Sequence, residues 1–311
     1  IRDEALLYDT AGSKTDEYLD HAVDIAGLSA TETVTSLVLS GGGDTDGSTA
    51  AVEESTLTLV DNANVALTSI DATGWNANLN VLALGDMATG TTIDFGGADS
   101  TLTVAEASLG ISKLVIDGGD GTDTIAATNL GGVATHTYVV NAANVEIMDL
   151  DIGDDSDAQL AATSIDLSGA GQLTHLKLNV DIATTSTDAE KIDEDLTISG
   201  LANNATIEFS SADTDATGYS DDTNGSVTVN AGAGANTITV TNKGATGAVT
   251  VGNGTGGLIL GAPYKTATIS NVVASDAFTI ANLQAAGLTS LSLDAATIAS
   301  NGALTVSALA A

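Results

Sequence analysis

Short alternating strands at a nearly constant spacing are the feature that most constrains the fold of this chain. In the last third, apolar residues alternate with Ser or Thr at 226–229, 237–240 and 248–251, which is a spacing of about eleven residues. Period-two alternation rich in β-branched residues is typical of β-strands. Similar runs extend from about residue 33 to residue 306. The chain is therefore expected to be almost entirely β.

The segments between these runs favour one of two β architectures. Tight hairpins usually carry Asn-Gly or Asp-Gly between alternating runs, whereas the linkers here are longer and varied, as at Asn230–Asn236. We therefore predict a parallel β-helix, or β-solenoid, in which successive coils stack on one another. Tandem β-sandwich domains are the alternative. No linker marks a firm boundary, so we treat residues 33–311 as one β-rich repeat region and leave open a subdivision near 180–225.

The N-terminal residues 1–32 have a different pattern. Residues 15–26 place apolar side chains at helical spacing, Thr15 suits an N-cap, and Gly27 follows the last apolar residue. We expect a short amphipathic helix here. It would cap the end of the β-stack or link it to a further domain.

The charge of the chain excludes several classes of function. Its 41 acidic and 7 basic residues give a net charge of -34, which leaves too little positive charge for nucleic-acid binding. Carboxylates at this density repel one another, so divalent cations, high salt or an extended body must offset the repulsion. An acidic surface adapted to saline water is the alternative to a metal partner. No apolar run approaches the ~20 residues of a membrane-spanning helix, so we expect no membrane span.

The sharpest motif lies at residues 117–125. It reads as one copy of a repeat in which glycines allow tight turns, aspartates and turn carbonyls bind Ca²⁺, and a large apolar residue points into a β-helical core. We predict Ca²⁺ binding by the carboxylates of Asp117, Asp120 and Asp123 and by the carbonyls of Gly119 and Gly121. An acidic glycine-rich loop without a metal is the alternative.

Acidic turns recur between other expected strands. Hard cations need several oxygen ligands, and closely spaced aspartates in a turn can supply them. A solvated acidic turn is the alternative for each of these loops. The further residues that we predict as Ca²⁺ ligands are Asp44, Asp46, Asp94, Asp99, Asp154, Asp155, Asp157, Asp213 and Asp215.

Catalytic constellations are weak in this sequence. The three histidines, His21, His136 and His175, lack zinc-ligand spacing, and no nucleophile elbow or phosphate-binding loop is present. The chain has no Cys, which excludes disulfides and thiol nucleophiles. Polysaccharide-active β-helices need basic residues and aromatic platforms, and this chain has a single Trp. We predict that the protein is not an enzyme.

Three stretches together resemble calcium-dependent bacterial surface-layer proteins and related RTX-type secreted surface proteins. They are residues 118–125, 139–150 and 196–199. The resemblance implies type I export, folding with Ca²⁺ and assembly into lattices or other cell-surface structures. The sequence departs from many members by having one full repeat instead of a tandem array, which leaves the number of ions open.

These observations lead to one functional expectation. We expect a secreted structural protein that self-assembles at the cell surface, as a surface layer or an extracellular filament, and that Ca²⁺ stabilises. The expected partner is therefore a second copy of the chain, and a cell-surface polysaccharide is a further candidate. A secreted adhesin or ligand-binding β-module is the alternative function.

Overall fold

The computed structural model describes most of the repeat region and four residues before it. The described residues are 21–24, 36–41, 56–61, 68–75, 77–83, 89–105, 109, 114–128, 136–151, 163–180, 191–192, 195–211, 217–219, 226–242, 249–252, 256–272, 277–295 and 303–307.

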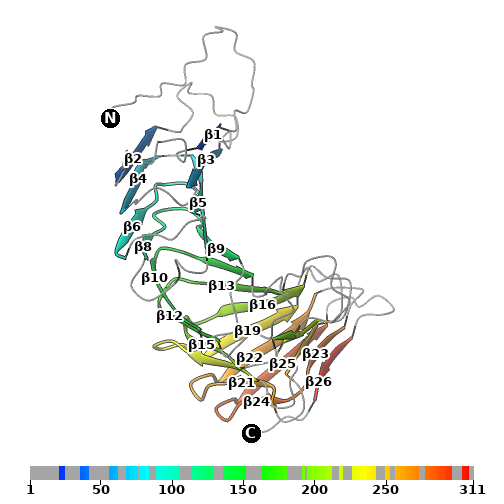
Figure 1. Ribbon diagram of the computed structural model, residues 1–311. Coiled ribbons are helices and arrows are strands. Elements are labelled where there is room, and N and C mark those ends of the chain that lie inside the picture. Colours follow the sequence, from blue (N-terminus) through cyan, green and yellow to red (C-terminus); the bar gives the residue numbers. More distant parts are fainter. Residues whose placement is uncertain are drawn as a thin grey trace, which may run out of the picture.

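The described strands form three sheets that run along one stack of coils (Figure 1). Sheet 1 has eleven strands: β1 (His21–Asp24), β3 (Thr56–Asp61), β5 (Asn78–Ala83), β7 (Ser100–Ala105), β9 (Thr124–Thr128), β11 (Ile147–Asp151), β13 (His175–Val180), β16 (Ala205–Ser211), β19 (Thr237–Asn242), β22 (Thr266–Asn271) and β25 (Ser290–Ala295). Sheet 2 has ten: β2 (Ser36–Gly41), β4 (Ser69–Trp75), β6 (Thr91–Asp94), β8 (Leu114–Asp117), β10 (His136–Ala143), β12 (Thr163–Gly169), β15 (Leu196–Leu201), β18 (Val227–Ala231), β21 (Leu258–Leu260) and β24 (Leu283–Gln284). Sheet 3 has five: β14 (Lys191–Ile192), β17 (Thr217–Tyr219), β20 (Val249–Val251), β23 (Phe278–Ile280) and β26 (Leu304–Val306).

The pairing of these strands confirms the predicted parallel β-solenoid. Every strand pair among the described residues is parallel, and each strand pairs with the equivalent strand of the coil before or after it. The alternative of tandem β-sandwiches is wrong, because sandwiches are built from antiparallel pairs.

The predicted N-terminal helix is wrong where the structure describes it. His21–Asp24 forms β1, which pairs with β3 in register from His21 with Leu57 to Asp24 with Val60. Helical spacing in a short segment is a weak local signal, and pairing with a sheet edge overrides it. The remaining residues of the predicted helix, 15–20 and 25–26, lie outside the described residues.

The length of a coil varies along the chain, and among the described strands sheet 3 is present only from β14 onward (Figure 1). Contacts between neighbouring coils span 23 residues around Ser100 and Asp123, where each coil has two strands. They span 31 residues at Asp195 and Ser226, where β14 and β17 have added a third strand. The third strand alone does not set the coil length, because the spacing is already 28 residues at Glu146 and Thr174, before β14, and is 24 residues at Lys265 and Thr289, where sheet 3 is present.

The core is a narrow column of aliphatic side chains between the sheets. Strands alternate buried and less buried positions, as in β12 and β18, so one face of each strand points inward. Leu, Ile, Val and Ala predominate in the column, and it is continuous across the coils. Phe209 of sheet 1 and Phe278 of sheet 3 meet with ring centroids 6.3 Å apart, which ties the two sheets together.

Candidate functional site

Two glycine- and aspartate-rich turns lie directly over one another at one corner of the solenoid. Residues 95–99 connect β6 to β7, and residues 118–123 connect β8 to β9. The flanking strands fix the register, because Asp94 pairs with Asp117 and Thr101 pairs with Thr124. The motif that the sequence singled out therefore stacks on a second predicted acidic turn from the preceding coil.

Backbone hydrogen bonds join these two turns, and glycine permits their close approach. The amide of Asp120 donates to the carbonyl of Gly96 at 3.1 Å. Gly119 and Gly121 adopt φ values of 82° and 114°, which side chains rarely tolerate. A Cβ atom at Gly119 would lie 2.1 Å from the carbonyl oxygen of Gly96, so only glycine fits there.

Two carboxylates of the site accept hydrogen bonds from main-chain amides of the neighbouring coil. Oδ1 of Asp99 accepts a hydrogen bond from the amide of Thr122 at 2.7 Å. Oδ1 of Asp123 accepts one from the amide of Ser100 at 2.8 Å, in the opposite direction. These reciprocal bonds fix the spacing of the two turns, since bonds to a charged acceptor are stronger than neutral ones.

The next coil adds two residues that the sequence did not point to. Oε2 of Glu146 accepts a hydrogen bond from the amide of Asp123 at 2.9 Å. The side-chain amide of Asn144 donates to Oδ1 of Asp117 at 2.7 Å. Asn144 itself has a positive φ of 52°, so it occupies a turn position of the third stacked coil. The site therefore extends over three coils.

Asp123 is the unusual residue of this site. It is only 1% exposed, and its Oδ2 atom accepts no hydrogen bond from any described residue. The pKa of Asp123 is raised to about 7, chiefly by burial and also by the carboxylates of Glu146, Asp99 and Asp117, and the hydrogen bond from the Ser100 amide opposes this rise. A buried oxygen without a partner is costly unless a proton or a cation satisfies it.

The absence of a side chain at Gly118 leaves room for the carbonyl oxygen of Asn144 beside the Oδ2 atom of Asp123. A Cβ atom at Gly118 would lie 1.8 Å from the carbonyl oxygen of Asn144 and 2.8 Å from Oδ2 of Asp123. The two oxygens thus line the same face of Gly118, and any side chain there would displace them. A carboxylate and a main-chain carbonyl are the hard oxygen donors that Ca²⁺ prefers.

A row of three aspartates runs beside the turns on sheet 2. Asp71, Asp94 and Asp117 occupy equivalent positions of successive coils. Burial raises the pKa of Asp94, and the charges of Asp117 and Asp71 raise it further. Hydrogen bonds from the hydroxyl and the amide of Thr73 lower the pKa of Asp71. Like charges at neighbouring positions repel one another, so a cation bound between them would be favoured.

The structure brings together half of the predicted ligands. Asp99, Gly119, Asp120, Gly121 and Asp123 lie in the stacked turns, and Asp94 and Asp117 are the strand residues directly before those turns. Asp44, Asp46, Asp154, Asp155, Asp157, Asp213 and Asp215 lie outside the described residues. The contributors that sequence reasoning missed are Asp71, Asn144 and Glu146. The signal for Asp71 and Glu146 was the recurrence of acidic residues at one coil's spacing, which is 23 residues for Asp123 and Glu146, whereas Asn144 had no such signal.

The donors fit a hydrated Ca²⁺ in chemistry but do not form a complete protein cage. Within the described ranges, no three His, Cys, Asp or Glu side chains gather closely enough to hold a metal ion. Ca²⁺ takes six to eight oxygen ligands. Oδ2 of Asp123 and the carbonyl of Asn144 would therefore act with water molecules and further turn oxygens.

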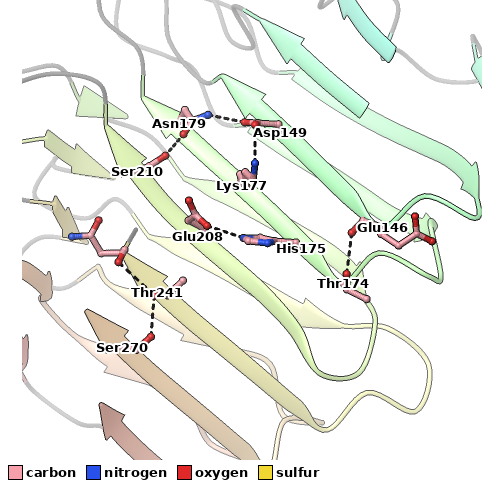
Figure 2. Close-up of polar contacts among 11 residues, drawn as sticks. Glu146, Asp149, Thr174, His175, Lys177, Asn179, Glu208, Ser210, Thr241 and Ser270 are labelled. Carbon is pink, nitrogen blue, oxygen red and sulfur yellow. Dashed lines mark hydrogen bonds and ion pairs between the residues drawn. The ribbon is translucent and has the colours of Figure 1, made fainter. Parts of the chain in front are cut away.

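A second polar cluster lies on the outer face of sheet 1 (Figure 2). Nζ of Lys177 lies 3.3 Å from Oδ2 of Asp149, and the side-chain amide of Asn179 donates to Oδ1 of the same aspartate at 2.6 Å. The hydroxyl of Ser210 in turn donates to Oδ1 of Asn179. Polar groups of three successive strands, β11, β13 and β16, are thereby joined across the coils.

Beside this chain of contacts lies a half-buried ion-pair arrangement. Nε2 of His175 lies 2.8 Å from Oε2 of Glu208, whose side chain is 9% exposed. His175 is partly exposed, and its partner lies 33 residues further along the chain, so no local sequence pattern pointed to the pair. On the next coils, Ser270 donates to Thr241 at 2.9 Å. Since these groups satisfy one another, the cluster stabilises sheet 1 rather than presenting free groups to a ligand.

Comparisons with known proteins find no relative from which a function could be transferred. No protein-family model matches the sequence, and neither the curated proteins nor the solved structures contain a match. Within the residues that the structure describes, no helix has the length and apolar character needed to cross a membrane. The functional argument therefore depends on the residues of the solenoid itself.

Proposed function

We propose that this chain is a secreted structural protein that assembles with copies of itself at the cell surface, and that Ca²⁺ bound at the stacked acidic turns stabilises it. The polar side chains on the outer face of sheet 1 bond to one another, which indicates a structural role for them. A regular stack of coils with parallel sheet edges is suited to building larger structures.

One observation carries the calcium part of this proposal. The Oδ2 atom of Asp123 is buried without a hydrogen-bond partner among the described residues, while three further carboxylates raise the pKa of its group. A divalent cation would neutralise this concentration of negative charge and satisfy the oxygen at the same time. Weak extracellular Ca²⁺ modules bind with constants of about 10⁻⁴ M, so about 2 mM Ca²⁺ would add about 1.8 kcal/mol for one such site.

This magnitude explains why calcium would act outside the cell. Millimolar Ca²⁺ would stabilise the coils, whereas the low calcium of a cytoplasm would leave the carboxylates repelling one another. The net charge of -34 adds to this effect, because every neutralised carboxylate also lowers the repulsion along the stack. Folding would thereby be coupled to export.

Thermal unfolding and sedimentation velocity test the proposal together. We expect about 2 mM CaCl₂ to raise the melting temperature and the sedimentation coefficient relative to the same protein in EGTA. NaCl of matched ionic strength is the control for simple charge screening, and MgCl₂ is the control for any divalent ion. A protein with equal stability in EGTA and CaCl₂, and monomeric in both, would contradict the proposal.

A further inference from the structure

We propose that Asn204, in the turn that joins β15 to β16, is a modification site that carries a covalently attached sugar. This inference goes beyond the proposed calcium-dependent assembly and shares with it only the expectation that the chain reaches the cell surface. Three observations support it: an acceptor tripeptide, a side chain without a structural role, and open space around the turn.

Residues 204–206 form the tripeptide Asn-x-Ser/Thr, which is the acceptor sequence for N-linked sugars. Asn204 is exposed in the turn directly before β16, and Thr206 is partly exposed on that strand, whereas Ala205 between them is fully buried. Residues two apart in a strand lie on the same face, so Thr206 lies on the outer face of sheet 1. The acceptor amide and the hydroxyl that identifies it therefore both lie toward solvent. The same tripeptide begins at Asn224 and Asn253, which lie outside the described residues.

The side chain of Asn204 has no structural role among the described residues, in contrast to that of its neighbour Asn203. Oδ1 of Asn203 accepts hydrogen bonds from the amides of Asn236 at 2.9 Å and Thr237 at 3.0 Å, so it holds the next coil in place. Asn204 contributes its main-chain amide, which donates to the carbonyl of Thr237 at 3.0 Å. No described residue forms a hydrogen bond with its side chain. The Nδ2 atom of Asn204 is therefore available for modification without loss of a contact.

The backbone of this turn does not by itself require an asparagine. Asn204 has a φ of 64°, a left-handed conformation that glycine adopts at the least cost. In the turn that joins β18 to β19 in the next coil, Gly234 adopts a φ of 77°. Glycine would thus satisfy the turn at position 204 as well. An asparagine there, followed two residues later by threonine, points to a use for the side-chain amide.

The turns of the two neighbouring coils leave room for a bulky group at this corner of the solenoid. Paired strands lie about 4.8 Å apart, so a sugar on one turn extends over the turns of the coils on either side. The turn that joins β12 to β13 carries Gly171, and the turn that joins β18 to β19 carries Gly234, both exposed. A Cβ atom at either glycine would meet no other part of the protein within 4 Å. The corner can therefore accommodate a sugar ring.

The chemistry of the transfer defines the donor by class. The bond that forms joins Nδ2 of Asn204 to the anomeric carbon of the sugar, and the bond that breaks joins this carbon to a diphosphate. The donor is therefore a sugar activated as a nucleoside or lipid diphosphate. The diphosphate leaves with the bonding electrons, and the amide loses one proton to a base of the transferase. Because β16 pairs with β13 and β19 on its two sides, the transferase must act before these coils close around residues 205 and 206.

Mass spectrometry of the full chain isolated from its source cells tests the modification directly. Trypsin releases residues 192–243 as one peptide, because Lys191 and Lys243 bound it and no Lys or Arg lies between them. We expect this peptide to gain the mass of one or more sugar residues, and electron-transfer fragmentation to place them on Asn204. Asn203 in the same peptide is the internal control, since it does not begin an acceptor tripeptide. A single sugar would indicate a nucleotide-sugar donor, and an oligosaccharide a lipid-linked one.

Substitutions that preserve the turn and the strand provide the second measurement. Asn204→Gly and Thr206→Val, expressed in the same cells, should lose the modification at position 204, whereas Thr206→Ser should keep it. Circular dichroism checks that the variants fold, and the wild-type peptide decides if they do not. An unmodified peptide 192–243 in protein from the cell surface, a sugar on Asn224 alone, or a modified Thr206→Val variant overturns this inference but leaves the proposed assembly standing. A sugar on Asn204 in protein that stays inside the cell supports the modification and overturns the proposed secretion.

Discussion

Replacement of the buried Asp123 by Asn should stabilise the protein in a chelator and remove its response to calcium. In the folded state the pKa of Asp123 is raised from 3.8 to about 7. A raised pKa on an acid means that folding favours the protonated form, so the free energy of unfolding falls as pH rises from about 4 to about 7. The full difference corresponds to about 4 kcal/mol above about pH 8.

Asn has the shape of Asp but cannot ionise. It keeps an oxygen for the amide of Ser100, and its NH₂ group takes the place of the Oδ2 atom near the carbonyl of Asn144. In EGTA at about pH 8 we therefore expect Asp123→Asn to raise the free energy of unfolding by up to about 4 kcal/mol. At about pH 4 the gain should vanish, because the wild-type side chain is then neutral.

Calcium should reduce the difference in stability between Asp123→Asn and the wild type. Addition of about 2 mM Ca²⁺ at about pH 8 should stabilise the wild type by about 1.8 kcal/mol at this site and leave Asp123→Asn unaffected there. Urea denaturation followed by circular dichroism, at several pH values, measures the free energy of unfolding of the wild type and of Asp123→Asn with and without Ca²⁺.

A matched variant separates this site from the general acidity of the chain. Asp120→Asn makes the same change in charge, but Asp120 is exposed in the same turn. We expect it to alter the pH profile only slightly. If Asp120→Asn and Asp123→Asn give the same pH profiles, or if the wild type in EGTA loses nothing at this site between about pH 4 and about pH 8, the reasoning about the buried carboxylate is refuted.

Three further substitutions test the packing of the solenoid, each by its urea midpoint. Gly119→Ala should cost about 3 kcal/mol, because φ is 82° and its Cβ would meet the carbonyl of Gly96, whereas Gly171→Ala has open space and should be neutral or stabilising by about 0.5 kcal/mol; equal effects would contradict the turn geometry. Glu208→Ala should cost about 1–3 kcal/mol by leaving a half-buried His175 without its partner, and a double-mutant cycle should show coupling; additive effects would argue against the pair. Phe209→Ala should cost about 3–5 kcal/mol, since Phe209 is fully buried where sheets 1 and 3 meet, and a cost below about 1 kcal/mol would contradict the packing.

The candidate site shows how far local sequence reasoning reaches. The motif at 117–125 and the turn at 94–99 could be recognised separately, because closely spaced Asp and Gly have a local meaning in turns. The stacking of these two turns depends on strand register between coils. The same register places Glu146, which has no local sequence signal, where it accepts a hydrogen bond from the amide of Asp123. Register across 23 residues follows from the packing of inward side chains, which no single segment specifies.

The regular alternation of the sequence by itself determined that this chain forms short strands with an aliphatic inward face. Apolar residues at every second position all point to one face in a strand, whereas in a helix they would point in different directions. The linkers without hairpin signals also indicated parallel coils. Only the tertiary structure decided that residues 21–24 join a sheet instead of a helix and that a third sheet is present, whose first described strand begins at Lys191. The physical reason is that each strand gains its hydrogen bonds and its burial from the coils above and below it, so its neighbours in space, not in sequence, set its final state.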